Sequence, residues 1–219
     1  MRDLRQRIER EYEAGRYGAG WRFLYGPAST LHGADVAFIG LNPGGSERDP
    51  YRAEFSCEAG SAYVRESWAG HPPGEAPLQW QVRTLFDGLG EVPASVLAGN
   101  LVPFRSRDWD SLPSSERATA FGLELWRDVL RSAEPSLIVT MGGTSFDLLA
   151  RLYGIAPRSV PTGWGRVSAR WGEADGCRIV GLPHLSRFRI VTRPQSEVAL
   201  RSLFGTRWSP GRPTASQRA

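Results

Sequence analysis

The segment Asp35-Val-Ala-Phe-Ile-Gly-Leu-Asn-Pro-Gly-Gly45 is an apolar, partly β-branched run that ends abruptly in a turn. Its apolar part is typical of a buried strand in a parallel sheet. Pro43 cannot donate a hydrogen bond to a neighbouring strand, and the two glycines after it tolerate positive φ and close approach of a ligand. Open α/β sheets place their sites in loops at the carboxyl ends of strands, so Asn42 is a candidate site residue.

Polar side chains follow two further apolar runs in the same way. Asn100, the only other asparagine of the chain, lies in the run 96–102, and His184, one of three histidines, follows the run 177–183. Any one of the three could be an ordinary turn or core residue. Their shared position at strand ends favours a common site at one edge of the sheet.

Strand-like and helix-like segments alternate along the rest of the chain. Apolar residues spaced by three and four positions indicate helices, and short β-branched runs indicate strands. The predicted helices cover 2–14, 78–89, 114–130, 144–153 and 195–204, and the predicted strands cover 35–40, 95–101, 137–141 and 177–182. Because this alternation produces right-handed βαβ units, we expect an α/β fold, a three-layer α/β/α sandwich with a central, mostly parallel four-stranded sheet.

The 219 residues fit a single domain, which we expect to cover residues 1–204. Residues 205–219 are polar and basic and contain two prolines, which predicts a disordered tail. Residues 155–176 contain several prolines and glycines with some apolar alternation, which is typical of a loop or of a hairpin.

Composition excludes several classes of function. All 27 basic residues are arginine, and the formal net charge is +4. Without lysine the chain cannot use the lysine of a P-loop, of a kinase or of a pyridoxal Schiff base. Two cysteines are too few for a cysteine-ligated metal or an iron–sulfur cluster, so we expect no metal and no cofactor. The basic balance favours an anionic partner.

The sequence also carries expectations about location and assembly. No apolar stretch approaches the length of about 18 residues that indicates a membrane span, and the charged amino terminus lacks the apolar core of a signal peptide. We therefore expect a cytoplasmic protein that does not bind membranes. We also expect a monomer without an obligate protein partner.

The strand-end segments resemble motifs of the uracil-DNA glycosylase superfamily. Gly40-Leu41-Asn42-Pro43-Gly44 resembles its first motif, in the form found in the mismatch-specific uracil-DNA glycosylases. Gly99-Asn100-Leu101-Val102 resembles the strand end that contacts the flipped base. Pro183-His184-Leu185-Ser186-Arg187 resembles the second motif, with Leu185 in place of the usual proline. The likeness covers about residues 33–204, including the strand–glycine–helix unit at 137–148.

The resemblance implies a role for each matched residue. Asn42 would position the attacking water, Asn100 would read the Watson–Crick edge of the base, and His184 would stabilise the leaving base. The loop after His184 would insert into duplex DNA, and its apolar or arginine side chains could form the wedge. Further base-pocket candidates are Gly40, Leu41, Pro43, Gly44, Gly45 and Phe55, where Phe55 either stacks on the base or serves ordinary packing. The DNA-contact candidates are Leu185, Ser186, Arg187, Phe188 and Arg105.

The chemistry of the residues is compatible with this reading. An enzyme that acts on a base of DNA must extrude the base into a pocket. Cleavage of the N-glycosidic bond needs a placed water and a hydrogen-bond donor for the charge that develops on the base. An amide does not take up a proton near pH 7, so Asn42 can orient water but cannot act as a general base. The lack of lysine excludes a Schiff base with the sugar, which predicts a monofunctional DNA glycosylase that leaves an abasic site.

The first motif also bears on the substrate. Strict uracil enzymes of the superfamily place a tyrosine after the proline of this motif, and the tyrosine blocks a 5-methyl group. Gly44 and Gly45 stand there in this chain, so we expect 5-substituted pyrimidines to be admitted. This leaves two biological roles, DNA repair at uracil or mismatches and antiviral defence by excision of a hypermodified cytosine from phage DNA. The alternative class is a non-catalytic DNA- or nucleotide-binding module in which the glycines cradle a phosphate.

Overall fold

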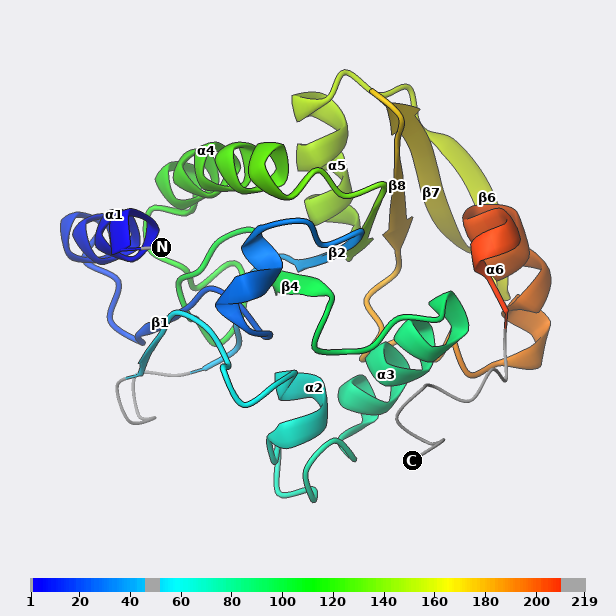
Figure 1. The fold of residues 1–219 in the computed structure, drawn as a ribbon, viewed down its shortest axis with the longest axis horizontal. Coiled ribbons are helices and arrows are strands. Elements are labelled where there is room, and N and C mark those ends of the chain that lie inside the picture. The colour runs from blue at the N-terminus through cyan, green and yellow to red at the C-terminus, as the bar shows by residue number, and fades with distance from the viewer. Residues whose placement is uncertain (1, 46–51, 210–219) are drawn as a thin grey trace.

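The computed structural model describes residues 2–45 and 52–209. The protein is an α/β protein with a mixed, largely parallel sheet of six strands that is flanked by helices. The strands are β2 (Val36–Gly40), β4 (Leu97–Asn100), β5 (Leu137–Met141), β6 (Arg158–Trp164), β7 (Val167–Ala174) and β8 (Cys177–Leu182). They lie in the order β4-β2-β5-β8-β7-β6, with β2 between β4 and β5 (Figure 1).

The four predicted strands are confirmed and form the parallel part of the sheet, β4-β2-β5-β8. The predicted number of four strands is too small, because β6 and β7 form an antiparallel hairpin that pairs with the free edge of β8. Only Thr162, Ala169 and Gly172 of the two hairpin strands are buried. The segment therefore lacks the continuous apolar run that marks the parallel strands.

Helices cover both faces of the sheet (Figure 1). Alternate residues of β2 face opposite ways, because side chains alternate along a strand. Ala37 and Ile39 join a core cluster with one set of helices, whereas Val36 and Phe38 join a second cluster with the other set. The first set is α1 (Arg2–Ala14), α4 (Ser115–Ala133) and α5 (Gly143–Leu152), and the second is α2 (Ala62–Arg65), α3 (Pro77–Leu89) and α6 (Glu197–Phe204).

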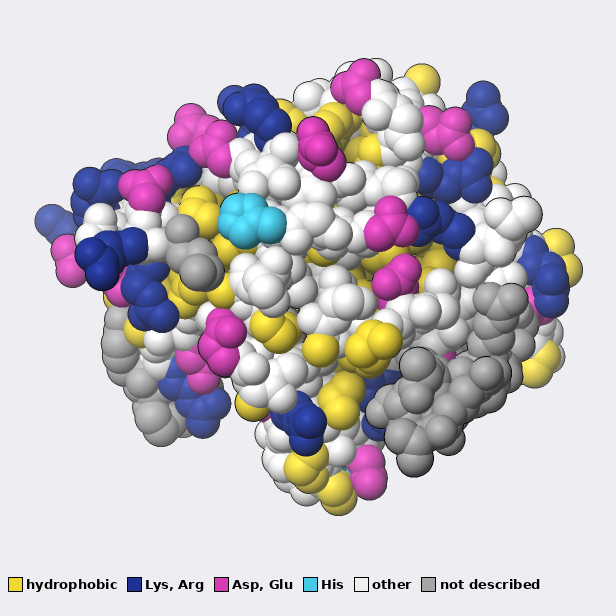
Figure 2. All heavy atoms as spheres, viewed as in Figure 1, with side chains coloured by type: hydrophobic (Ala, Val, Ile, Leu, Met, Phe, Trp, Pro, Cys, Tyr) yellow, Lys and Arg dark blue, Asp and Glu magenta, His cyan; other side chains and the backbone are white. Residues whose placement is uncertain are grey.

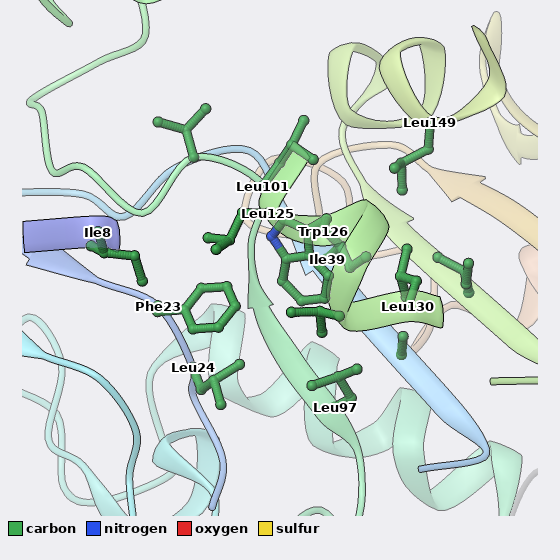
Figure 3. Packing of buried hydrophobic residues seen from close by; sticks show 14 of the residues in the cluster. Ile8, Phe23, Leu24, Ile39, Leu97, Leu101, Leu125, Trp126, Leu130 and Leu149 are labelled. Carbon is green, nitrogen blue, oxygen red and sulfur yellow. The ribbon is translucent and has the colours of Figure 1, made fainter. Parts of the chain in front are cut away.

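The five predicted helices are confirmed, with small differences at their ends. In the first core cluster, Trp126 of α4 packs among apolar side chains from β2, from β4 and from the chain after them (Figure 3). Two short strands, β1 (Trp21–Arg22) and β3 (Ala53–Glu54), pair in parallel outside the main sheet. Three 3-10 helices cover Ala28–Leu31, Pro194–Ser196 and Gly205–Arg207.

The folded chain continues past residue 204, where the sequence places the start of a tail. Trp208 is only 5% exposed, stacks on Phe204 with ring centroids 5.6 Å apart, and donates a hydrogen bond from Nε1 to Glu197 at 3.1 Å. A Cβ at Gly88 would overlap with its ring. Residues 205–209 are therefore part of the packed structure, and the rest of the predicted tail, residues 210–219, lies outside the described residues.

The described surface carries mixed charge on the face shown in Figure 2, where basic and acidic side chains alternate. Several arginines form ion pairs, such as Arg117 with Glu11 and Arg7 with Asp128. Within the described ranges, no helix has the length and apolar character needed to cross a membrane.

Candidate functional site

The three polar residues predicted at strand ends lie at the same edge of the sheet. Gly40 of β2 pairs with Asn100 of β4, Asn42 follows two residues after β2, and His184 follows two residues after β8. Only β5 separates β2 from β8. Neighbouring strands lie about 4.8 Å apart, so β2 and β8 lie about 10 Å apart with β5 between them. The backbones of Asn42 and His184 therefore leave the sheet about 10 Å apart, on either side of the end of β5.

The segment after β2 is held extended by the segment after β4. The backbone N–H groups of Leu101 and Val102 donate to the carbonyls of Gly40 and Leu41 at 2.9 and 2.8 Å. Further along, Gly44 forms a parallel bridge with Ser106. Asn42 therefore lies between two places, at Leu41 and at Gly44, where the backbone pairs with the segment after β4.

The side-chain amide of Asn42 has one orientation that satisfies its surroundings. Its Nδ2 lies 2.7 Å from the Oγ of Ser106 and 3.3 and 3.5 Å from the carbonyls of Pro43 and Phe104. The two carbonyl oxygens can only accept hydrogen bonds. The Ser106 hydroxyl already donates its hydrogen to the carbonyl of Asp108 at 2.7 Å, so its oxygen can also only accept from Asn42. Nδ2 must therefore face them, and Oδ1 has no hydrogen-bond partner among the described residues.

The remaining first-motif residues surround Asn42 closely. Gly40, as the last residue of β2, and Pro43 are buried, Leu41 is half-buried and Gly44 is exposed. A Cβ added at Gly44 would meet no atom of the described residues within 4 Å. Gly45 has φ of 153° and lies against the side chain of Arg105. The described residues therefore leave space at the position directly after Pro43.

Asn100 is 5% exposed, and its side chain is held on two sides. Its Nδ2 donates to the hydroxyl of Tyr25 at 3.1 Å. Its Oδ1 lies so close to Gly40 that a Cβ there would overlap with it. The backbone carbonyl of Asn100 accepts a hydrogen bond from Nε1 of Trp126 at 2.8 Å. The first-motif glycine is thus required for the close approach of the second asparagine.

Tyr25 is in turn supported by a buried arginine. Arg22 is 4% exposed, its guanidinium lies 4.3 Å from the centre of the Tyr25 ring, and it forms two hydrogen bonds with Glu66 at 2.8 and 2.6 Å. Burial opposes ionisation of both partners, but their mutual hydrogen bonds prevail, raising the pKa of Arg22 and lowering that of Glu66. Burial also raises the pKa of Tyr25, so its hydroxyl stays protonated.

His184 presents a defined tautomer. Its Nδ1 accepts from the backbone N–H of Ser186 at 3.4 Å and lies 2.7 Å from the Ser186 hydroxyl. A backbone N–H can only donate, so in the neutral ring the proton is on Nε2. Partial desolvation and the nearby charge of Arg187 lower the pKa of His184. The imidazole is therefore neutral near pH 7 and offers Nε2–H as a donor.

The predicted DNA-contact residues in the loop after His184 differ in their exposure to solvent. Ser186 and Arg187 are exposed, as expected of residues that meet DNA. Leu185 is 1% exposed and belongs to the core cluster beside α3 and α6, so it does not project as a wedge. Phe188 is half-buried, with its ring 6.1 Å from that of Trp164 on the β6–β7 hairpin.

Two other predicted residues occupy different places. Phe55 is 5% exposed and packs on Phe23, with ring centroids 5.7 Å apart, so the structure places it in the core. The aromatic side chain bonded to Asn100 is Tyr25 instead. Arg105 lies beside the first motif, and its Nε is buried without a hydrogen-bond partner. No ion pair of Arg105 with another described residue is present.

The sequence does not identify two residues of this arrangement, Ser106 and Tyr25. Ser106 follows Asn100 by six positions in an irregular segment, and Tyr25 stands among other aromatic residues before the first main strand. Neither position has a motif or a periodicity that distinguishes it. Only the pairing of segments distant in the sequence brings them to Asn42 and Asn100.

In the part of the chain that the structure describes, no group of three or more His, Cys, Asp or Glu side chains could hold a metal ion. A surface hollow of about 430 Å³ lies at the start of α4, between Trp109 and Leu123, and its lining includes neither of the two asparagines nor His184. No protein-family model matches this chain, and no curated protein matches its sequence.

Proposed function

We propose that this protein is a monofunctional DNA glycosylase. It flips out a non-canonical pyrimidine, hydrolyses the N-glycosidic bond and leaves an abasic site. One observation carries the proposal: Asn42 and His184 lie at the same edge of the sheet, one with an amide oxygen that no described residue occupies and the other with a neutral N–H donor. These are the two functions that hydrolysis of this bond requires, and the resemblance to the uracil-DNA glycosylase superfamily assigns the same roles.

Asn42 supplies the position of the water. Its Nδ2 is bound on the protein side, so Oδ1 accepts one hydrogen of the water and directs a lone pair toward C1′ of the extruded nucleotide. The amide takes no proton, so the proton that the water loses after attack passes to solvent or to the departing base anion. Bond cleavage therefore runs ahead of water attack, through a sugar with oxocarbenium character, and the fixed geometry lowers the entropic part of the barrier.

His184 supplies the donor for the leaving base. Negative charge accumulates on the base, chiefly at O2 of a pyrimidine, as the bond to the sugar breaks. A neutral Nε2–H stabilises this charge because its orientation is fixed in advance by the bonds at Nδ1. Since the chain has no lysine, no amine attacks the sugar, and the product is an intact abasic site.

Asn100 supplies recognition of the base. Its amide offers one acceptor and two donors, of which one donor is directed to Tyr25. Facing uracil, the oxygen would accept from N3–H and the remaining donor would reach O4. In the reverse orientation the amide would face N4–H₂ and N3 of cytosine, with the Tyr25 hydroxyl donating to Oδ1 instead. Both pyrimidines therefore remain candidate substrates.

The open space at Gly44 supports admission of 5-substituted pyrimidines. A Cβ at Gly44 meets no described atom within 4 Å, and Gly44 directly follows Pro43, where a tyrosine blocks this region in strict uracil enzymes. The substrate is then either uracil or a mismatched base, in DNA repair, or a bulky modified cytosine of phage DNA, in antiviral defence.

A cleavage assay tests the proposal. Oligonucleotides carrying uracil, a thymine mismatch, hypoxanthine, hydroxymethylcytosine or its glucosylated form are incubated with the protein, and alkali then reveals abasic sites. We expect cleavage of at least one substrate and none with Asn42→Ala. Cleavage at uracil favours repair, and cleavage only at the glucosylated base favours defence. DNA binding without cleavage of any substrate would favour the non-catalytic module and contradict the roles of Asn42 and His184.

A further inference from the structure

The β6–β7 hairpin carries an aromatic side chain next to the His184 loop. Trp164, the last residue of β6, is half-buried, and Phe188 meets it edge-on with ring centroids 6.1 Å apart. The guanidinium of Arg193 lies 4.5 Å from the centre of the same indole ring. The backbone N–H of Phe188 donates to the carbonyl of His184 at 3.1 Å. The hairpin end is thus coupled to the candidate active site through one short turn.

The position of the hairpin end is rigidly fixed. A register shift interrupts pairing between Pro161 and Trp164, and such irregularities change the direction of a strand. The Thr162 hydroxyl donates to the carbonyl of Val167 at 2.7 Å across the hairpin. Gly163 has φ of 74° and contacts the backbone carbonyl of Gln195 so closely that a Cβ would overlap with it. Trp164 is therefore held in place before any ligand binds.

The charged side chains around Trp164 are mainly positive, whereas basic and acidic side chains are mixed on the face shown in Figure 2. Residues 148–172 and 176–196 contain no aspartate or glutamate. Within the described ranges, the exposed arginines on the hairpin turn and the loop have no ion-pair partner. The guanidinium of Arg193 donates its one hydrogen bond among these residues to the neutral side chain of Gln195, at 3.1 Å. These exposed arginines are Arg166, Arg187 and Arg189. Uncompensated guanidinium groups around an aromatic ring suit an anionic ligand that also has flat, apolar rings.

We propose that the end of the β6–β7 hairpin binds unpaired DNA beside the flipped nucleotide. A base stacks on Trp164, and Arg166 and Arg193 contact the adjoining phosphates. Aromatic stacking combined with arginine–phosphate contacts is how proteins hold single strands without reading their sequence. This proposal rests on the proposed function only for the identity of the ligand as DNA, and it extends the contact surface beyond the loop that follows His184.

Binding of unmodified DNA tests this inference without any base removal. The full-length protein is titrated into a fluorescein-labelled single-stranded 16-mer and into its duplex, and anisotropy is measured at several salt concentrations. We expect Trp164→Ala to weaken single-strand binding about tenfold, in line with the loss of one base–aromatic stack. Trp164→Phe should retain most of the affinity, because it keeps a ring.

The arginines are tested by the salt dependence of the same binding. The double variant Arg166→Gln/Arg193→Gln should make the slope of log K against log salt shallower by about 1.4, since each phosphate contact on a single strand contributes about 0.7. The matched control is Arg127→Gln/Arg151→Gln, which removes two exposed arginines from α4 and α5 and should change the slope much less. Far-ultraviolet circular dichroism and thermal unfolding of each variant verify that the fold is intact.

The outcomes separate this proposal from the glycosylase proposal. Wild-type single-strand affinity in Trp164→Ala and a wild-type salt slope in the arginine variant would overturn the hairpin surface, even if the protein excises bases. An effect on duplex binding alone would overturn the stacking role of Trp164. If Trp164→Ala is unfolded, the arginine variant and Trp164→Phe still decide the question. Loss of excision in Asn42→Ala with unchanged single-strand binding concerns the active site alone.

Discussion

Nδ2 of Asn42 donates to the Oγ of Ser106 at 2.7 Å, and this contact ties the first motif to a segment that starts beyond the end of β4. The Ser106 hydroxyl continues the chain of bonds to the carbonyl of Asp108. An asparagine that holds a water in place does not exchange a proton, so its contribution depends on the orientation of its side-chain amide. Ser106 is thus a positioning residue of the proposed glycosylase.

Ser106→Ala should lower the rate of base removal two- to tenfold, the effect expected when one net hydrogen bond is lost. The carbonyls of Pro43 and Phe104 still accept from Nδ2, so the amide keeps its place less firmly but is not released. Single-turnover kinetics on the best substrate would show the change in the rate constant, with DNA affinity unaltered. Ser106→Thr retains the hydroxyl and should retain the rate. A wild-type rate in Ser106→Ala would contradict the positioning role.

Tyr25→Phe should reduce the free energy of unfolding by about 1–3 kcal/mol. The change leaves Nδ2 of Asn100 buried without its partner, and an unsatisfied buried polar group costs about this amount. Urea denaturation measures the effect. The matched control is Tyr63→Phe, because Tyr63 stacks on Tyr25 as a second buried tyrosine, whereas the described hydrogen bond to Asn100 comes from Tyr25. An equal loss of stability in both variants would show that the Tyr25–Asn100 bond is not the cause.

The parallel core of the fold was predictable because burial on both faces leaves an unmistakable pattern. β2 and β5 are buried at every position, and such runs have no other common explanation in a chain of alternating elements. The β6–β7 hairpin was not predictable as part of the sheet. The apolar residues of the hairpin lie on one of its faces only. Its pairing with β8 also needs the free edge of β8, which exists only once the parallel strands have assembled.

The candidate site divides in the same way. Asn42, Asn100 and His184 were predictable because strand ends in a parallel sheet converge by topology. Their partners were not, since Ser106 and Tyr25 reach them through contacts that span 64 and 75 residues. Phe55 shows the opposite case. An aromatic residue in a loop near the motif suggests a stacking partner for the base, but the Phe55 side chain packs in the core.

Gly44→Tyr should convert a permissive base pocket into a restrictive one. Gly44 is not among the glycines with positive φ, and no atom of the described residues lies within 4 Å of its Cβ position, so a side chain should fit without backbone strain. We expect the variant to fold and to lose activity on 5-substituted pyrimidines at least tenfold more than on the unsubstituted base. Paired cleavage assays on the same sequence with and without the substituent provide the measurement.

The control for this substitution is Gly45→Tyr. At Gly45, φ of 153° disfavours any side chain and Arg105 lies close by, so we expect loss of stability without a change in preference. Equal loss of activity on both substrates in Gly44→Tyr, with the fold intact, would show that this position does not face C5 of the base.

His184 should titrate below its ordinary pKa of about 6.5 and carry its neutral proton on Nε2. Desolvation and then the charge of Arg187 both disfavour the imidazolium form. Arg187→Gln removes only the second cause, so the pKa should rise but remain below the ordinary value. Two-dimensional ¹H–¹⁵N spectra of the histidine side chains report both the tautomer and the titration, with His184→Gln providing the assignment.

The sign of the shift also sets the pH dependence of stability. The unfolded chain binds this proton more readily than the folded protein does, so the free energy of unfolding should fall as pH drops through about 6.5. The fall should be smaller in Arg187→Gln and absent for this group in His184→Gln. Base removal should be independent of this group above that pH, because the ring is already neutral. A proton found on Nδ1, or a pKa raised above the ordinary value, would exclude His184 as a neutral donor to the leaving base.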